Sequence, residues 1–118
     1  MRNLLVGFLV GTLTVGSAIY CLQSAIASSA EVEVLLENNR VRVRQVRFEP
    51  GIHYGNHTHP YAHVGVILDE GTLEFIESGK SEKKEFKAGQ VGWRDANVTH
   101  EVVNAGKNPM RVIEVELK

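Results

Sequence analysis

The sequence predicts an all-β domain, a sandwich or a barrel of short strands. After residue 30, short runs rich in β-branched or aromatic residues alternate with turn signals. No stretch in that part of the chain shows a persuasive 3.6-residue period. About seven or eight strands at this spacing fill one domain and leave no room for a second.

The predicted strands follow one another from residue 40. Residues 40–48 alternate with Val41 and Val43 on one face, and the apolar set then moves to Val46 and Phe48, which predicts a β-bulge at Gln45. The alternating run AHVGVIL, residues 62–68, predicts the next strand. Later strands are predicted by TLEFIE, KKEFKA, VGWR, HEVVN and MRVIEVEL, and turns by EPG, DEG, SGK, KAGQ and NAGKNP.

The N-terminus has the layout of a secretory signal. Arg2 precedes an uncharged apolar stretch, and small residues follow it in AIASSA. We therefore predict a signal peptide over residues 1–27, with cleavage after Ala27 or Ala30. An uncleaved membrane anchor is the alternative, because the uncharged run is long enough to span a bilayer. Both interpretations place the domain of residues 31–118 outside the cytoplasm, periplasmic or secreted.

The amino-acid composition limits the kinds of binding partner and covalent link that we expect. The only cysteine, Cys21, lies within the predicted signal, so the mature domain has no disulfide. The formal net charge is −1 and no basic stripe with interleaved aromatic residues occurs, which argues against nucleic acid as a partner. A domain this small gains from a metal or from association. Apolar strand positions such as Ile113, Val115 and Leu117 favour a homodimer.

Four of the five histidines lie between residues 53 and 63. His57 and His59 are two apart, so on an extended segment both side chains project from one face. His63 belongs to the next predicted strand, where it shares a face with Gly65. Rings from two neighbouring strands can converge on one point, and imidazole nitrogens bind zinc and similar ions. His100, far along the chain, is the candidate for a further ligand.

Two stretches resemble the paired motifs of the cupins. The segment GIHYGNHTHPYAH resembles the first motif, a glycine, five residues, His-x-His, three or four residues and usually Glu, with a later glycine. The segment GQVGWRDANVTHEVVN resembles the second, a glycine, five residues, Pro-x-Gly, two residues, His, three residues and Asn. The matching positions are Gly51, His57, His59, His63 and Gly71 in the first motif, and Gly89, His100 and Asn104 in the second.

This resemblance implies a fold, a site and a class of function. The fold is a double-stranded β-helix, or jelly roll, with a divalent metal ion inside the barrel near one end. The implied ligands are His57, His59, His63 and His100. Iron suits an oxygenase, while zinc, nickel, copper and manganese are alternatives. The implied function is metal-dependent chemistry on a small organic molecule, dioxygenase-like before isomerase or lyase. A metal- or small-ligand-binding module without turnover is the alternative.

The chain departs from the family pattern at three points. His63 stands where most of the family has glutamate, and a neutral imidazole there would leave the ion more Lewis acidic and favour an anionic substrate. A hydrogen-bonding role for His63 beside the metal is the alternative. Asp95 and Asn97 replace Pro-x-Gly, which we interpret as a structural change, because Asp and Asn also suit turns and Asn tolerates a left-handed backbone. The gap from His63 to Gly71 is one residue longer than usual.

Strand parity and residue type predict positions for several other side chains. We expect His53, Tyr61, Trp93 and Asn104 to line the pocket, although plain core packing is the alternative for the aromatic residues. The arginines of the first predicted strand, Arg42 and Arg44, are expected in solvent unless their face turns inward. Glu114 and Glu116 are expected on the outward face of the last strand.

Overall fold

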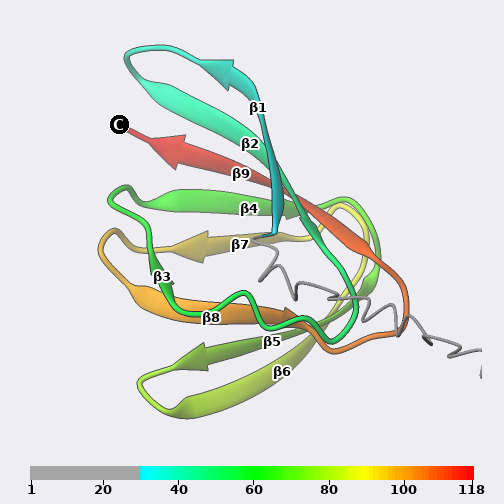
Figure 1. The fold of residues 1–118 in the computed structure, drawn as a ribbon. Helices are drawn as coiled ribbons and strands as arrows, with labels where there is room; N and C mark the ends of the chain where they lie inside the picture. Colours follow the sequence, from blue (N-terminus) through cyan, green and yellow to red (C-terminus); the bar gives the residue numbers. More distant parts are fainter. Residues whose placement is uncertain (1–29) are drawn as a thin grey trace, which may run out of the picture.

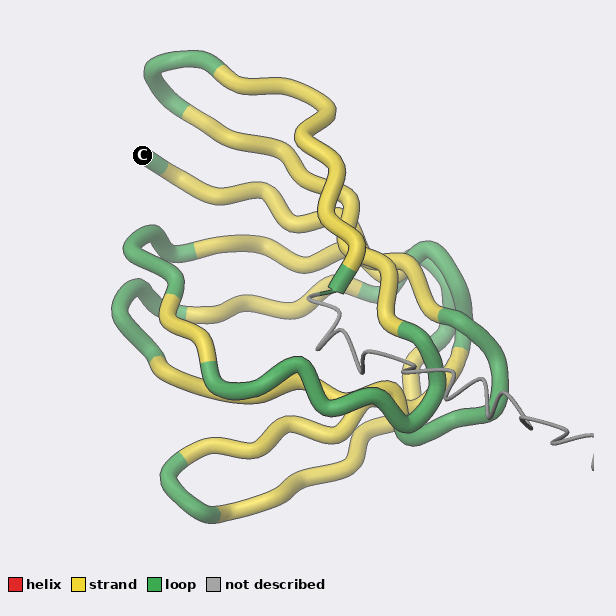
Figure 2. Tube along the Cα trace, viewed as in Figure 1, coloured by secondary structure: helices red, strands yellow, loops and turns green. Residues whose placement is uncertain are grey.

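A computed structural model describes residues 30–118, and these residues form two antiparallel sheets without a helix (Figures 1 and 2). The predicted all-β class is confirmed. The predicted signal peptide or anchor, residues 1–27, lies outside the described residues. Within residues 30–118, no helix has the length and apolar character needed to cross a bilayer.

The larger sheet has five strands and the smaller has four. The order in the larger sheet is β1 (Glu31–Glu37), β2 (Val41–Phe48), β9 (Met110–Leu117), β4 (His63–Ile67) and β7 (Val91–Arg94). The order in the smaller sheet is β3 (His57–Thr58), β8 (Thr99–Asn104), β5 (Gly71–Glu77) and β6 (Lys80–Phe86). Figure 1 shows the two sheets closer together at one end of their strands than at the other, with β1 and β6 at their outer edges.

Strand β2 pairs with β9 in an unbroken register from Val41 to Phe48, so the predicted bulge at Gln45 is wrong. The register shift lies instead in β1, between Val34 and Leu36. The apolar pattern of β2 changes faces for another reason. Its inward face begins with two arginines and ends with two apolar residues, in the order Arg42, Arg44, Val46 and Phe48.

Strand β1 was not among the predicted strands. Its sequence, EVEVLLE, alternates for four residues and then breaks at the bulge, and all seven residues are exposed. An edge strand without a buried face imposes little periodicity on its sequence, which explains why the pattern gave no signal. Strand β6 also begins earlier than expected, at Lys80, because the turn at Ser78 and Gly79 takes a left-handed backbone, with φ of 50° and 74°.

The space between the sheets is apolar at one end and polar at the other. Both sheets contribute to the core, which consists of Val46, Phe48, Ile67, Leu73, Phe86, Val102, Met110 and Val112. Along β9 the inward positions change from Met110 and Val112 to Glu114 and Glu116, and all four are buried. Because neighbouring strands change in the same way, charged and imidazole groups gather at one end of the barrel.

Gly71 is a position at which any side chain would collide with the core. A Cβ atom there would lie 2.6 Å from Sδ and 3.0 Å from Cγ of Met110, which is fully buried. We expect Gly71→Ala to lower the free energy of unfolding by about 1–3 kcal/mol in chemical denaturation. Gly65→Ala is the control, because its Cβ would meet Val112 Cγ1 at an ordinary 3.7 Å. Equal stabilities of the two variants would contradict this account.

Candidate metal centre

Three imidazoles meet between β3 and β8. His57 lies on β3 and faces His100 across the ladder, and the chain places His59 just after β3. The Nε2 atoms of His57 and His100 are 3.1 Å apart. One ring nitrogen from each of the three histidines lies within 4.8 Å of the others. The short β3–β8 ladder and the two-residue spacing of the His-x-His segment therefore bring the rings together.

His63 adds a second group that shares His59 with the first. It lies on β4, and its ring centroid is 4.5 Å from that of His59. A carboxylate oxygen of Glu114 lies within 4.8 Å of nitrogens from both histidines. Glu114 thus supplies a carboxylate near the position where the sequence has His63 instead of the usual glutamate. Its charge is shared with Arg44, with which it forms an ion pair.

The donor set fits a divalent ion. Three buried ring nitrogens have no hydrogen-bond partner among the described residues, namely Nε2 of His59, Nδ1 of His63 and Nδ1 of His100. A buried polar atom left without a partner costs about 1–3 kcal/mol. Coordination of a metal by Nε2 of His59 and Nδ1 of His63 would offset that cost, whereas His100 directs Nε2, not its unpartnered Nδ1, toward His57. Histidine is a common ligand for zinc, iron, copper and nickel.

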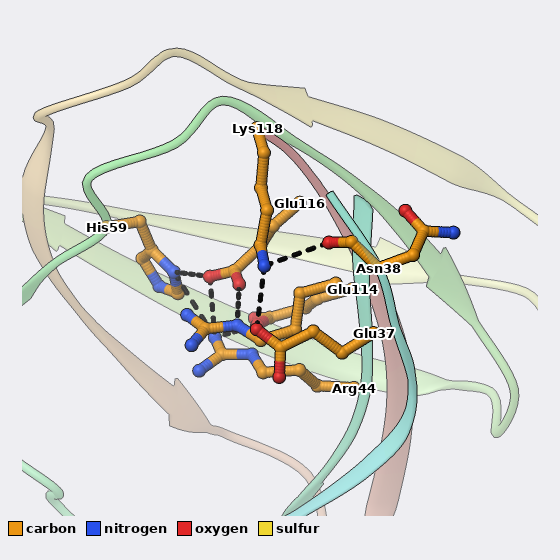
Figure 3. A network of polar contacts seen from close by, with 8 residues as sticks. Glu37, Asn38, Arg44, His59, Glu114, Glu116 and Lys118 are labelled. Atoms are coloured by element: carbon orange, nitrogen blue, oxygen red, sulfur yellow. Dashed lines mark hydrogen bonds and ion pairs between the residues drawn. The ribbon is translucent and has the colours of Figure 1, made fainter. Parts of the chain in front are cut away.

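Glu116 orients the shared ligand, His59. The buried carboxylate of Glu116 lies 3.2 Å from Nδ1 of His59 (Figure 3). It also forms an ion pair with Arg42. Nη2 of Arg44 lies at the same 3.2 Å from Nδ1 of His59. In the tautomer whose Nδ1–H donates to Glu116, His59 keeps Nε2 free as a lone-pair donor. A carboxylate behind a histidine ligand is a common arrangement in metal sites, where it fixes the ring and raises its basicity.

The outward placement expected for Glu114 and Glu116 is therefore wrong. Both face the interior, where Arg44 and Arg42 pair with them, so the arginines do not lie in solvent as the default expectation had it. Burial alone would raise the pKa of Glu116, but hydrogen bonds from Arg42 and His59 outweigh it and leave that pKa below its usual value. Strand alternation alone could not show which face of β9 turned inward. The matching Arg-x-Arg and Glu-x-Glu patterns of two strands were the available signal.

The turn before β8 holds the His-x-His segment in place. The backbone N–H of Asn97 donates to the carbonyl oxygen of His59 at 2.8 Å. Asn97, in the place where the second motif lacks its Pro-x-Gly, has a φ of 62°, a left-handed backbone that asparagine tolerates. The substitution therefore preserves a turn that anchors a candidate ligand.

Burial favours the neutral form of three of the imidazoles. It is the main cause that lowers the pKa of His57, His63 and His100, and for His100 the pKa falls to about 3. Neighbouring imidazoles lower these values further. Neutral rings are the form that binds metal, so the site is prepared for an ion at neutral and mildly acidic pH.

The metal-free protein should lose stability as the pH falls from about 6.5 toward 3. Unfolded histidines take up protons below about 6.5, whereas the folded rings resist protonation because their pKa values are lower. The unfolded state thus binds more protons, and acid favours it. Chemical denaturation with a chelator at pH 7.5 and 5 measures the effect. His100→Asn should flatten the pH slope, and exposed His53→Ala should not. A wild-type stability equal at both pH values would contradict the assignment.

Of the remaining residues expected to line the pocket, Trp93 borders a cavity, and the other three lie elsewhere. Nδ1 of His53 is 3.1 Å from Glu101, at the surface. Asn104 is fully buried, but it acts as a clamp, because its amide donates to the carbonyls of Phe48 and Asn108. Tyr61 is half-buried between β3 and β4, and Trp93 is 54% exposed on the outer face of β7.

Two cavities flank the histidines. The first, which we call the β7 chamber, measures about 260 Å³ and is lined among others by His63, Gly65, Phe75, Gly92, Arg94 and His100. The second, the β2 chamber, measures about 290 Å³ and is lined among others by Val32, Arg42, Arg44, Tyr54, His57 and His59. Glu114 borders both chambers. Small molecules could therefore reach the histidines from two sides.

Comparison with known proteins points to one family. Residues 44–116 match the family model described as Cupin domain. The chain is 36% identical over 86 residues to the beta-alanine degradation protein BauB of Pseudomonas aeruginosa, covering 72% of this chain and 90% of the relative.

Solved structures agree with that match. A cupin domain from Bordetella pertussis Tohama I superposes with a TM-score of 0.71 at 30% identity, covering 76% of this chain and 94% of that one. A protein described as a predicted oxalate decarboxylase, from Thermotoga maritima, has a TM-score of 0.58 at 25% identity, covering 75% and 81% of the two chains.

Proposed function

The chain belongs to the cupin family, and on that premise we propose that it is an exported metal-dependent enzyme acting on a small organic molecule. The observation that carries the proposal is the convergence of His57, His59, His63 and His100, three of which keep a buried nitrogen without a partner. Dioxygenase-like chemistry is the first candidate reaction, and isomerase or lyase chemistry is the second. The relative's name refers to the degradation of β-alanine, a small molecule, which supports a role in small-molecule metabolism.

The protein's own groups would bind, orient and shield. A bound divalent ion supplies Lewis-acid chemistry and, if it is iron, chemistry with oxygen. Glu116 holds His59 in one tautomer and one orientation. The apolar core below the histidines excludes water from one side of the site. Glu114 is the carboxylate whose oxygen lies within 4.8 Å of nitrogens of His59 and His63, so it could join them in holding an ion.

A binding module without turnover is the second candidate. The two carboxylates beside the histidines, Glu114 and Glu116, are both engaged by arginines. Neither is therefore free to act as a general base, and proton transfer by the protein has no evident agent among the described residues. That arrangement suits an ion that is held, or an ion that does the chemistry itself.

Elemental analysis of the protein purified from its native compartment, without added metal, tests the proposal. We expect close to one divalent ion per chain. Iron or copper together with oxygen consumption on a substrate supports the oxygenase, whereas zinc supports Lewis-acid chemistry or the binding module. A protein without metal, whose affinity for iron, copper, nickel, manganese and zinc is no better than that of the His57→Ala/His59→Ala/His100→Ala variant, would refute both.

We also propose that the chain pairs as a homodimer through the outer face of the larger sheet. One apolar residue from each of its five strands lies in a single row of cross-strand partners, namely Leu36, Val43, Val115, Val64 and Trp93. Continuous apolar rows of this kind are typical of interfaces. Light scattering should give a dimer for the wild type and a monomer for Trp93→Lys. A wild-type monomer at micromolar concentration contradicts the proposal.

A further inference from the structure

The β7 chamber exists because two inward positions on neighbouring strands lack side chains. Gly65 of β4 pairs with Gly92 of β7, and both line the chamber. A Cβ at Gly92 would meet no atom within 4 Å, and one at Gly65 would meet only Val112 Cγ1, at 3.7 Å. Neither position has a positive φ, so the backbone does not require glycine there. Glycine weakens a strand, and a facing pair of them leaves space for something else.

Arg94 provides a charge at this space. It lies two residues beyond Gly92 on the same face of β7, opposite His63, and is half-buried. Its guanidinium carbon lies 4.5 Å from the ring centroid of Phe75, which fixes the group against the chamber wall. Among residues 30–118, no carboxylate forms an ion pair with Arg94 or with Arg40, whereas Arg42, Arg44, Arg47 and Arg111 each have at least one.

The rest of the lining is partly apolar, and its buried carboxylate, Glu114, is already paired with Arg44. Leu73, Phe75 and Phe86 contribute apolar walls, and His63 and His100 lie at the inner end. Glu82 and Lys84 of β6 border the chamber as exposed residues of opposite charge, so they add little net field. A volume of about 260 Å³ lies just below the usual range for drug-sized ligands, which indicates a compact molecule.

We propose that the β7 chamber binds a small organic acid, with its carboxylate on Arg94 and its apolar part over the Gly65–Gly92 pair. This inference rests on the proposed function, since the bound acid would lie against His63 and His100, where the metal is expected. An unpaired guanidinium is the group best suited to hold a carboxylate through two parallel hydrogen bonds. The aromatic walls would hold the apolar part, and the missing side chains leave it room.

The test compares two pairs of probes that differ in charge but hardly in shape, butyrate with butyramide and hexanoate with hexanamide. Each is titrated into the full-length chain, with and without added metal, while the backbone amide signals of Gly65 and Gly92 are followed by NMR. In the wild type we expect the acids to bind at least about tenfold more tightly than the amides. Arg94→Gln should abolish that preference, and Arg94→Lys should keep part of it. Exposed Arg111→Gln is the matched control and should change nothing.

Gly92→Val tests the space independently of the charge. The new side chain enters empty volume, so the variant should fold as well as the wild type yet bind both acid and amide at least about tenfold more weakly. Equal affinity for acid and amide in the wild type, or a preference that survives Arg94→Gln, would overturn the inference. Metal analysis of each protein separates the two proposals. Bound metal without a preference for acids refutes the acid chamber alone, and a preference for acids without metal refutes the metal-dependent function.

Discussion

Replacing His59 with alanine should weaken the binding of a divalent ion by on the order of a hundredfold or more. His59 is the one histidine that belongs to both groups of potential ligands, with His57 and His100 on one side and His63 and Glu114 on the other. Changes to residues behind a ligand already cost roughly tenfold to a hundredfold, so loss of the shared ligand should cost at least as much. Calorimetric titration of the chelator-treated protein measures the affinity.

Companion variants locate the ion more finely. Exposed His53→Ala is the control and should bind as the wild type does. If the ion lies between β3 and β8, His57→Ala and His100→Ala weaken binding far more than His63→Ala does. The reverse order places the ion beside His63 and Glu114. Unchanged affinity in His59→Ala would exclude both groups as the metal site.

Glu116→Gln should combine a large loss of stability with weaker metal binding. The amide keeps the size of the carboxylate but removes its charge, leaving Arg42 without its counter-ion and His59 without a strong acceptor. Breaking a buried charge pair costs about 3–5 kcal/mol. Because Arg42 is 29% exposed, we expect on the order of 2–3 kcal/mol here. Metal affinity should fall roughly tenfold to a hundredfold, since the shared ligand loses its orienting partner.

A surface pair gives the comparison for Glu116. Glu70 and Lys87 form an ion pair whose side chains are 70% and 80% exposed, and Glu70→Gln should cost less than about 1 kcal/mol. Denaturation curves and metal titrations on both variants separate the two cases. If Glu116→Gln were no worse than Glu70→Gln in both measurements, the Arg42–Glu116–His59 contacts would have no role in the site.

Most strands were predictable because apolar and polar residues alternate along their sequences. β4 and β5 alternate and are bounded by turn residues, and both agree with the structure within a few residues. β1 was missed because an exposed edge imposes no periodicity. Hydrophobicity alone does not identify the inward face of β2. In a barrel with a polar end, an inward face begins with Arg42 and Arg44 and becomes apolar only farther along.

The histidines were predictable because their spacing alone gives them common faces, with the cupin motifs adding the partner strand. The second layer of the site was not. Glu116 approaches His59 from β9, and a contact across 57 positions leaves no local pattern in one sequence. For Asn104 the motif gave a clear signal but did not reveal the residue's role. Its place in the motif suggested the pocket, but its amide closes the turn after β8. A motif position indicates that a residue matters, whereas its contacts show how.

The position of β9 also constrains when the domain can fold. This strand follows all others in the described part of the chain, yet it lies between β2 and β4 in the larger sheet. Its ladder with β2 joins Val41 to Leu117. Strands β2 and β4 therefore lack β9, the strand that joins them, until synthesis has nearly reached the last described residue. Such distant pairings form slowly, because the whole intervening loop must close first. For the export proposed above, late closure would have a use, because the larger sheet could not close before its final strand is available.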